Sequence, residues 1–249
     1  MNNNIINGDP VIRVMNLHKS FDNNLVLRGI SLDLNKGQNL VIVGRSGTGK
    51  SVLIKCVVRL MWPDKGSINV LGQNVLDLSD HELNELRIKV GYLFQEGALY
   101  DSMSLEENLL FPLKRNRPGL PKAEMQELVR VSLENVDLAE ASEKMPSELS
   151  GGMRKRAGLA RTLILNPEII LYDEPTTGLD PYTSREISEL IVRIQEKYNA
   201  SSIVVTHDMK CARTVSDQIS ILHDGQFIAK GSFNDLKNHE NPTIRNYFI

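Results

Sequence analysis

The residue types at positions 44–51 could bind a phosphate group. The segment reads Gly44-Arg45-Ser46-Gly47-Thr48-Gly49-Lys50-Ser51 and matches the phosphate-loop template at every fixed position. Glycines let backbone N–H groups turn toward phosphate oxygens, and the helix that follows offers its N-terminus to an anion. Lys50 would reach the β- and γ-phosphates, and the Ser51 hydroxyl would ligate magnesium. An apolar strand before the loop and an amphipathic helix after it argue against a chance glycine-rich turn.

A second group of residues could handle the metal and an attacking water. Asp173 and Glu174 follow the apolar run at 169–172. Ligands bind at the carboxyl ends of strands in open α/β sheets, where both carboxylates would lie. Asp173 would hold magnesium, directly or through water, and Glu174 would orient or deprotonate the water. Two acids after an apolar run are equally typical of a solvated strand end, so the phosphate loop is what favours the catalytic interpretation.

A third segment offers another helix start that suits an anion. Leu149-Ser150-Gly151-Gly152-Met153 precedes the basic run 154–156. Ser150 is a favourable N-cap residue, and the two glycines leave backbone donors uncovered. The chain then has two helix starts that could bind phosphate but only one acidic pair. This is explained if the second helix start completes a site on another copy of the chain. The alternative is an ordinary capped helix. We expect Arg154, Lys155 and Arg156 to form a solvated helix face, with an arginine near the nucleotide of a partner chain as the alternative.

These residues need a parallel sheet to bring them together. Residues 40–43 and 203–205 are continuous apolar runs, typical of strands buried on both faces. Residues 96–166 are mostly helical in character, so the alternating pattern indicates an α/β fold with a helical insertion. The other predicted elements are strands at 11–17, 25–34 and 90–94, and a strand or hairpin at 67–75. A helix carries Val52, Leu53, Cys56, Val57 and Leu60, another begins at Asp180-Pro181, and a hairpin has its turn at Asp224-Gly225.

Composition limits the class of protein. The chain has 249 residues, of which 41% are hydrophobic and 24% charged, which fits one α/β domain with a core. A formal net charge of -2 does not favour nucleic-acid binding. The sequence has no signal-peptide layout and no apolar run near the ~20 residues of a membrane span. Cys56 and Cys211 have neither metal-ligand nor disulfide spacing, so we expect them to be reduced, as in the cytoplasm.

Taken together, the motifs resemble the ATP-binding subunit of an ABC transporter from end to end. Residues 44–51 are similar to the Walker A motif, 169–174 to Walker B and 149–153 to the ABC signature. The motifs occur in the same order as in the family. This combination identifies the family far more specifically than any single motif does. Further matches are Gln95 to the Q-loop glutamine, Asp180 to the D-loop aspartate, His207 to the switch histidine and Phe21 to the aromatic residue that stacks on adenine.

Some of these residues have simpler interpretations when taken alone. Phe21 is typical of a core aromatic, Gln95 of a surface amide at a strand end, and His207 of a residue that caps the next element. In the family, the glutamine contacts the magnesium or the water and couples to the permease, and the histidine contacts the γ-phosphate. The resemblance therefore implies Glu174, His207 and Gln95 as catalytic residues, with Mg²⁺ held by Ser51, Gln95 and Asp173.

The resemblance also implies the architecture. The fold would be a P-loop NTPase of the α/β class, with a RecA-like core containing a mixed sheet, an antiparallel β subdomain and an inserted α-helical subdomain. One ABC ATPase domain would span 11–249, with its core at 11–95 and 167–240 and its helical subdomain at about 96–166. The polar segments 1–10 and 241–249 would be tails. Two copies would form a head-to-tail homodimer, with ATP between residues 44–51 of one copy and Ser150, Gly151, Gly152 and Asp180 of the other.

A finer resemblance narrows the cargo. Residues 93–103 and 145–156 are similar to the Mla-type, MCE-associated phospholipid-transport ATPases. Met153 stands where most ABC families carry glutamine, and methionine is usual in the Mla-type group. The resemblance implies an MlaE-like membrane permease, an MlaD-like MCE lipid-binding protein and a place on the cytoplasmic face of the inner membrane, without nucleic acid. We expect residues 96–112 to contact the permease.

Three other functions remain as alternatives. The chain could serve another cargo, such as amino acids or lipoproteins. It could be a non-transport ABC ATPase that acts on ribosomes or DNA, but those families usually carry two ATPase domains in one chain or a long coiled-coil insertion, and neither feature is seen in this sequence. A small-molecule P-loop kinase would not explain residues 149–153.

Overall fold

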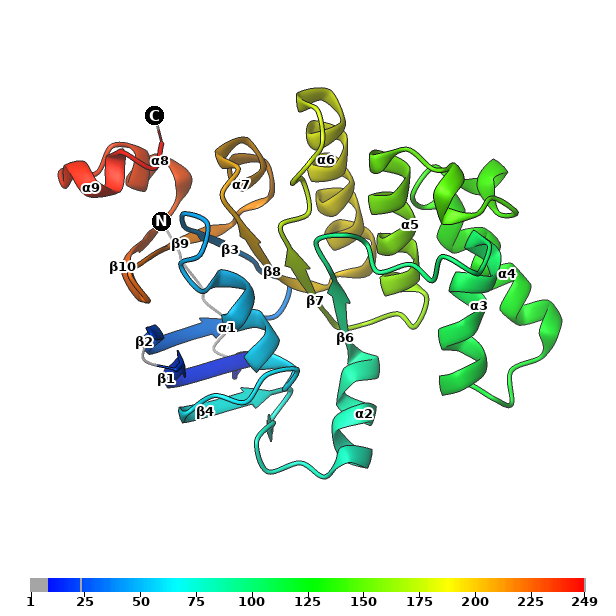
Figure 1. The fold of residues 1–249 in the computed structure, drawn as a ribbon, viewed down its shortest axis with the longest axis horizontal. Helices are drawn as coiled ribbons and strands as arrows, with labels where there is room; N and C mark the ends of the chain where they lie inside the picture. Colours follow the sequence, from blue (N-terminus) through cyan, green and yellow to red (C-terminus); the bar gives the residue numbers. More distant parts are fainter. Residues whose placement is uncertain (1–8, 23, 249) are drawn as a thin grey trace, which may run out of the picture.

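A computed structural model describes residues 9–22 and 24–248, so most of the predicted tail at 1–10 lies outside the described residues. Within them, a six-stranded sheet has the order β10-β9-β3-β8-β7-β6 (Figure 1). The strands β9, β3, β8, β7 and β6 run parallel, and β10 pairs antiparallel to β9. Their bounds are β3 Asn39–Val43, β6 Val90–Leu93, β7 Ile169–Asp173, β8 Ser201–Thr206, β9 Gln218–His223 and β10 Gln226–Gly231.

A second, antiparallel sheet has the order β2-β1-β4-β5. Its strands are β1 Ile12–Phe21, β2 Asn24–Leu34, β4 Lys65–Val70 and β5 Gln73–Asn74. The prediction of strands in these regions is confirmed, but β1 continues to Phe21 rather than ending at residue 17. The mixed and antiparallel sheets agree with the predicted α/β fold class.

Two hydrophobic clusters lie on opposite faces of the parallel sheet. Leu40 and Ile42 of β3 belong to one cluster, and Val41 and Val43 belong to the other, because alternate side chains of a strand point to opposite faces. The first cluster joins the antiparallel sheet to helices α1 (Lys50–Val57) and α2 (Asp80–Lys89). The second contains α6 (Pro181–Tyr198) and α7 (Met209–Val215). Burial on both faces explains the continuous apolar runs in these strands.

Two details differ from the sequence prediction. Helix α1 ends at Val57, so Leu60 is not part of it and remains 49% exposed. Helix α2 was not predicted, although Ser79 and Glu82 form a capping box at its start, which is a signal that the sequence carries. Its Leu83 and Leu86 pack into the first cluster and bring the chain to β6.

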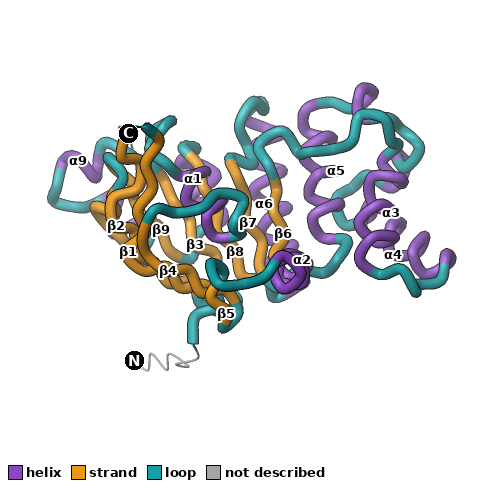
Figure 2. Tube along the Cα trace, turned by 60° about the horizontal axis from the view of Figure 1, so that its bottom comes forward, coloured by secondary structure: helices purple, strands orange, loops and turns teal. Residues whose placement is uncertain are grey.

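Helices gather beyond the β6 edge of the sheet (Figures 1 and 2). They are α3 (Leu105–Asn116), α4 (Lys122–Glu134) and α5 (Gly151–Leu163), with short 3-10 turns at Ala139–Ala141 and Pro146–Glu148. Helix α5 contacts β6, α3, α4 and α6, so it connects this helical region to the sheet. None of the helices in residues 9–22 and 24–248 is both long and apolar enough to cross a membrane.

The C-terminal segment packs on its own chain. Helices α8 (Phe233–Lys237) and α9 (Pro242–Arg245) follow β10. Tyr247 and His223 are hydrogen-bonded through the hydroxyl and Nδ1 at 2.8 Å, and the rings of Phe248 and Phe233 lie 5.2 Å apart edge to face. These contacts hold the described part of the predicted tail, up to residue 248, against β9 and α8.

Candidate active site

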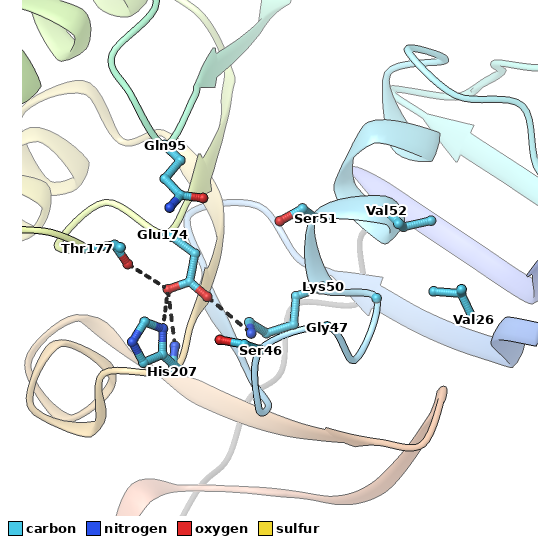
Figure 3. Close-up of a pocket in the computed structure, with 11 residues that line it drawn as sticks. Val26, Ser46, Gly47, Lys50, Ser51, Val52, Gln95, Glu174, Thr177 and His207 are labelled. Atoms are coloured by element: carbon cyan, nitrogen blue, oxygen red, sulfur yellow. Dashed lines mark hydrogen bonds and ion pairs between the residues drawn. The ribbon is translucent and has the colours of Figure 1, made fainter. Parts of the chain in front are cut away.

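The parallel sheet places three loops with chemically active residues together at the carboxyl ends of its strands. Val43 of β3 pairs with Thr206 of β8, and Asp173 of β7 pairs with Val205 of β8, so these strands end side by side. The next residues are the phosphate loop, Glu174 and His207. A pocket of about 380 Å³ opens between them (Figure 3). Its lining consists of Val26, Ser46, Gly47, Gly49, Lys50, Ser51, Val52, Gln95, Glu174, Thr177 and His207.

The phosphate loop has the backbone geometry that its glycines allow. Gly49 precedes α1 with a φ of 98°, in the left-handed region, and a Cβ atom there would lie 2.8 Å from Val26 Cγ1. Lys50 folds back over the loop and donates hydrogen bonds to the carbonyls of Gly44 at 2.9 Å and Arg45 at 3.1 Å. Residues of the loop and the Lys50 side chain therefore line the same pocket. Loops of this kind hold phosphate through backbone amides and the lysine ammonium.

The Glu174 carboxylate lies at the centre of the pocket (Figure 3). Its Oε1 is 3.1 Å from Lys50 Nζ, and its Oε2 is 2.8 Å from His207 Nδ1. Oε2 also accepts hydrogen bonds from the Thr177 hydroxyl and from the backbone N–H of His207. The backbone of Glu174 has a φ of 51°, which is uncommon for a residue with a side chain. Such backbone geometry is frequent at functional sites.

Both carboxylate oxygens of Asp173 accept hydrogen bonds. Ser51 donates its hydroxyl hydrogen bond to Oδ1 at 2.5 Å, and Tyr92 donates to Oδ2 at 2.9 Å. Burial, and then the neighbouring Asp173 charge, raise the pKa of Tyr92, so its hydroxyl stays protonated and can donate. Tyr92 comes from β6, next to β7, and is not among the site residues predicted from the sequence.

The oxygen donors fit magnesium. No three His, Cys, Asp or Glu side chains gather into a metal cage among the described residues. Mg²⁺ needs no such cage, because it is commonly held by one or two carboxylates together with substrate phosphates and waters. The Ser51 hydroxyl and the Asp173 carboxylate are adjacent to each other and to the phosphate loop, and Gln95 lines the same pocket.

The prediction of a solvated basic face on α5 is wrong for Lys155 and Arg156, whereas Arg154 is exposed as expected. Lys155 is only 6% exposed and donates hydrogen bonds to the backbone carbonyls of Gln95 and Glu174. Burial lowers the pKa of Lys155, and the nearby carboxylates of Asp173, Glu174 and Glu96 act in the opposite direction. The side chain points inward because α5 packs closely on the loop after β6.

Arg156 is also engaged rather than solvated. Its guanidinium forms ion pairs with Asp137 at 2.8 Å and with Glu186 of α6 at 3.0 Å. Arg154 donates a hydrogen bond to the Leu149 carbonyl at 2.7 Å. Each of the three basic side chains therefore has a structural partner within the chain.

Some of the predicted nucleotide residues lie away from the pocket. Phe21 ends β1, is 41% exposed and does not line the pocket, and Lys19 Nζ lies 5.3 Å from the centre of its ring. Val26 and Thr177 line the pocket and are not among the residues predicted from the sequence. Val26 is an aliphatic residue of β2, and Thr177 is a hydroxyl residue in the turn after β7.

The helix start at Ser150 lies next to the start of α6. Ser150 caps α5 by accepting the N–H of Met153 at 3.2 Å, and Asp180 caps α6 as predicted, accepting from Tyr182 and Thr183 at 3.0 Å. Hydrogen bonds, first of all from the Thr183 side chain, lower the pKa of Asp180. A Cβ atom at Gly152 would lie 2.5 Å from Thr183 Cγ2. Neither helix start lines the pocket of this chain.

Comparisons with known proteins agree with this geometry. The family described as "ABC transporter" matches residues 27–177, more than half of the chain. The chain is similar to the "Probable ribonucleotide transport ATP-binding protein mkl" of Mycobacterium leprae, at 41% identity over 95% of this chain and 68% of that protein. It is similar to the "Intermembrane phospholipid transport system ATP-binding protein MlaF" of Haemophilus influenzae, at 39% identity over 91% of this chain and 85% of that protein.

Two further similarities concern another cargo and the fold. The "Methionine import ATP-binding protein MetN" of Rhizobium etli is 36% identical over 90% of this chain and 61% of that protein. Among solved structures, a dimeric post-hydrolysis state of the ATP-binding cassette MJ0796 bound to ADP and Pi has a TM-score of 0.81 and 30% identity, covering 89% of this chain and 98% of that one. The pocket residues, the fold and these matches agree: the chain belongs to the ABC transporter family and is its ATP-binding, ATP-hydrolysing subunit.

Proposed function

We propose that the pocket binds Mg-ATP with the following division of roles. Lys50 and the backbone of residues 44–51 hold the β- and γ-phosphates, and Ser51, Asp173 and Gln95 hold the metal. Bound Mg²⁺ would neutralise charge on the phosphate oxygens. The observation that carries this proposal is the convergence of Lys50, Glu174 and His207 on one pocket, next to the Ser51–Asp173 pair.

Within this arrangement Glu174 acts on the attacking water. Its carboxylate is anchored at Oε2 by His207 and Thr177, which leaves Oε1 to face the phosphate loop. A carboxylate in that position can orient a water molecule or take its proton. His207 would then contact the γ-phosphate. Phe21 would stack on the adenine, and for this the Lys19 ammonium would have to share the Phe21 ring with the adenine or move away from it.

A homodimer would complete two such sites. Ser150, Gly151, Gly152 and Asp180 lie at two helix starts that do not face the pocket of their own chain. Helix N-termini attract anions. In a head-to-tail pair, these starts would cover the ATP held by the partner's phosphate loop. The similarity to a dimeric ATP-binding cassette supports this arrangement.

Phospholipid is the proposed cargo. Support comes from the similarity to MlaF, from residues 93–103 and 145–156, and from Met153 in the signature segment. An MlaE-like permease and an MlaD-like MCE protein would be the partners, with the ATPase on the cytoplasmic face of the inner membrane. Methionine import is the second candidate, favoured by the similarity to MetN.

The permease would dock at a groove beside β6. A hollow of about 220 Å³ is lined by Tyr92, Phe94, Gly97, Ala98, Pro112, Gly158, Arg161 and Thr162. Tyr100 lies beside it, 41% exposed, with its ring against Arg161 and Phe111. The buried Asn108 bonds to the backbone of Tyr100, Met103 and Ser104, so the loop is held in shape. A preformed aromatic groove suits a helix from a partner.

The experiment that tests this function is co-purification followed by reconstitution. The tagged chain is isolated in mild detergent, the membrane protein that accompanies it is identified, and the complex is placed in vesicles. ATP turnover is then measured with added phospholipid and, separately, with methionine. We expect stimulation by phospholipid only. A response to methionine alone would replace the lipid cargo by the second candidate, and failure to bind Mg-ATP would contradict the roles assigned to the pocket.

A further inference from the structure

Lys155 is a buried charge to which the roles proposed above assign no function. It is 6% exposed, and its ammonium donates to two backbone carbonyls, of Gln95 and of Glu174, the second at 3.3 Å. Burying an ammonium group is costly unless hydrogen bonds or opposite charges compensate. The two carbonyls therefore compensate for the burial of the Lys155 ammonium, and the ammonium in turn restrains both carbonyls.

Both restrained residues reach into the pocket. The side chains of Gln95 and Glu174 line it from two different loops, one after β6 and one after β7. The carbonyl and the carboxylate of Glu174 belong to one residue, whose φ is 51°, so a shift of this backbone displaces both groups. A single ammonium on α5 thus connects the backbones of the metal-contacting glutamine and of the proposed water-activating glutamate.

Helix α5 and the loop after Gln95 fit too closely to move independently. A Cβ atom at Gly158 would lie 2.7 Å from the Gly97 carbonyl oxygen, and a Cβ atom at Gly97 would lie 3.0 Å from the Arg154 carbonyl oxygen. Residues three apart share a helix face, so Lys155 and Gly158 face the loop together. Displacing α5 along or around its axis would therefore displace this loop.

The same helix begins at Ser150, five residues and roughly 7.5 Å along the axis before Lys155. On the proposed function, on which this inference rests, Ser150 covers the ATP held by the partner. We infer that Lys155 is a positioning residue that links the two ATP sites of the dimer. When Ser150 closes on the partner's nucleotide, α5 moves, and Lys155 carries that movement to the backbones of Gln95 and Glu174 in its own site.

Turnover by the full chain as a function of ATP concentration, together with the affinity for a fluorescent ADP analogue, tests this link. For wild type we expect a Hill coefficient above about 1, with the two sites setting the upper limit. Lys155→Met keeps the length of the side chain and removes the donor. We expect ADP-analogue affinity within about twofold of wild type, turnover lowered about 10- to 100-fold by misplaced catalytic groups, and a Hill coefficient near 1.

Arg156→Met is the matched control, because it removes a basic side chain from the same helix and loses two ion pairs, to Asp137 and Glu186. It should keep the wild-type Hill coefficient. Lys155→Gln retains one amide donor group, so its turnover and Hill coefficient should lie between those of wild type and Lys155→Met. If circular dichroism shows that Lys155→Met is unfolded, Lys155→Gln provides the test.

Two results would overturn the inference. One is a folded Lys155→Met or Lys155→Gln variant with wild-type turnover and Hill coefficient. The other is a wild-type protein that hydrolyses ATP without any cooperativity, because the sites then do not communicate. Failure of the proposed function is distinguishable from both, since wild type would then bind no ADP analogue and hydrolyse no ATP.

Discussion

The Lys50 ammonium and the Glu174 carboxylate lie 3.1 Å apart inside the pocket, and both side chains are at most 10% exposed. The lysine that should bind the terminal phosphates is therefore paired with the carboxylate that should activate water. A triphosphate carries the same sign of charge as the carboxylate, so it competes with Glu174 for Lys50. On the roles proposed above, nucleotide binding would rearrange this pair before the water is positioned.

Replacing Glu174 by Gln should separate binding from hydrolysis. The amide is neutral, so it competes less strongly for Lys50, and it cannot take a proton from water. We expect turnover to fall at least about 100-fold, as for loss of a general base, while the affinity for ADP rises. Steady-state turnover and an ADP titration without magnesium measure the two effects. Unchanged turnover would move the catalytic role to another residue.

Replacing Lys50 by Ala should damage both activity and stability. The variant loses the ammonium group that would bind the β- and γ-phosphates, so ATP turnover should nearly vanish. It also leaves Glu174 buried with His207 as its remaining ionisable partner, and breaking a buried pair costs about 3 kcal/mol of unfolding free energy. Adding Glu174→Gln should recover part of that loss in urea denaturation, because no unpaired carboxylate remains. Purely additive losses would show that the pair is not coupled.

Removing the Tyr92 hydroxyl should weaken the magnesium site selectively. Tyr92→Phe deletes the hydrogen bond to Asp173 Oδ2, so the carboxylate is less well oriented toward Ser51. We expect the magnesium concentration for half-maximal thermal stabilisation in the presence of ADP to rise about tenfold, with little change in ADP binding without metal. Tyr198→Phe is the control, since it loses a hydrogen bond from Asn135 away from the pocket. Equal shifts in both variants would argue against a metal-orienting role.

The two cysteines should react slowly in the folded protein. Both are buried and unpaired, and burial raises the pKa of Cys56 to about 11 and that of Cys211 to about 12. The nucleophilic thiolate is therefore scarce at pH 8. A thiol reagent should label the protein fully only after denaturation. Rapid labelling of both thiols in the native state would contradict the burial of these groups.

The same shifts predict a loss of stability in alkali. An unfolded cysteine ionises near its ordinary pKa of 9.0, whereas the folded protein holds the neutral thiol up to about 11 or 12. Stability from these groups is thus complete below pH 9 and falls as the pH rises through the window from about 9 to 12. Urea denaturation at pH 8 and pH 10.5 measures the fall. It should be smaller in a Cys56→Ala, Cys211→Ala double variant, and an equal fall would assign the effect to other groups.

By itself the sequence determined the elements whose signals are local. The phosphate loop, the apolar strands at its side and the two acids at the end of β7 are recognisable because each is a contiguous pattern. Parallel pairing then makes the carboxyl ends of β3, β7 and β8 meet. The N-cap role of Asp180 is equally local, because an N-cap needs only the next three residues.

Only the tertiary structure decided which side chains complete the site. Lys155 reads as part of a charged surface run, and it is buried because Gly158 lets α5 approach the loop after Gln95. Tyr92 binds Asp173 because β6 lies beside β7, 81 residues away in the chain. Phe21 matched a family position in sequence, yet its ring lies outside the pocket lining. These outcomes depend on packing between distant segments, and no local pattern of residue types encodes such packing.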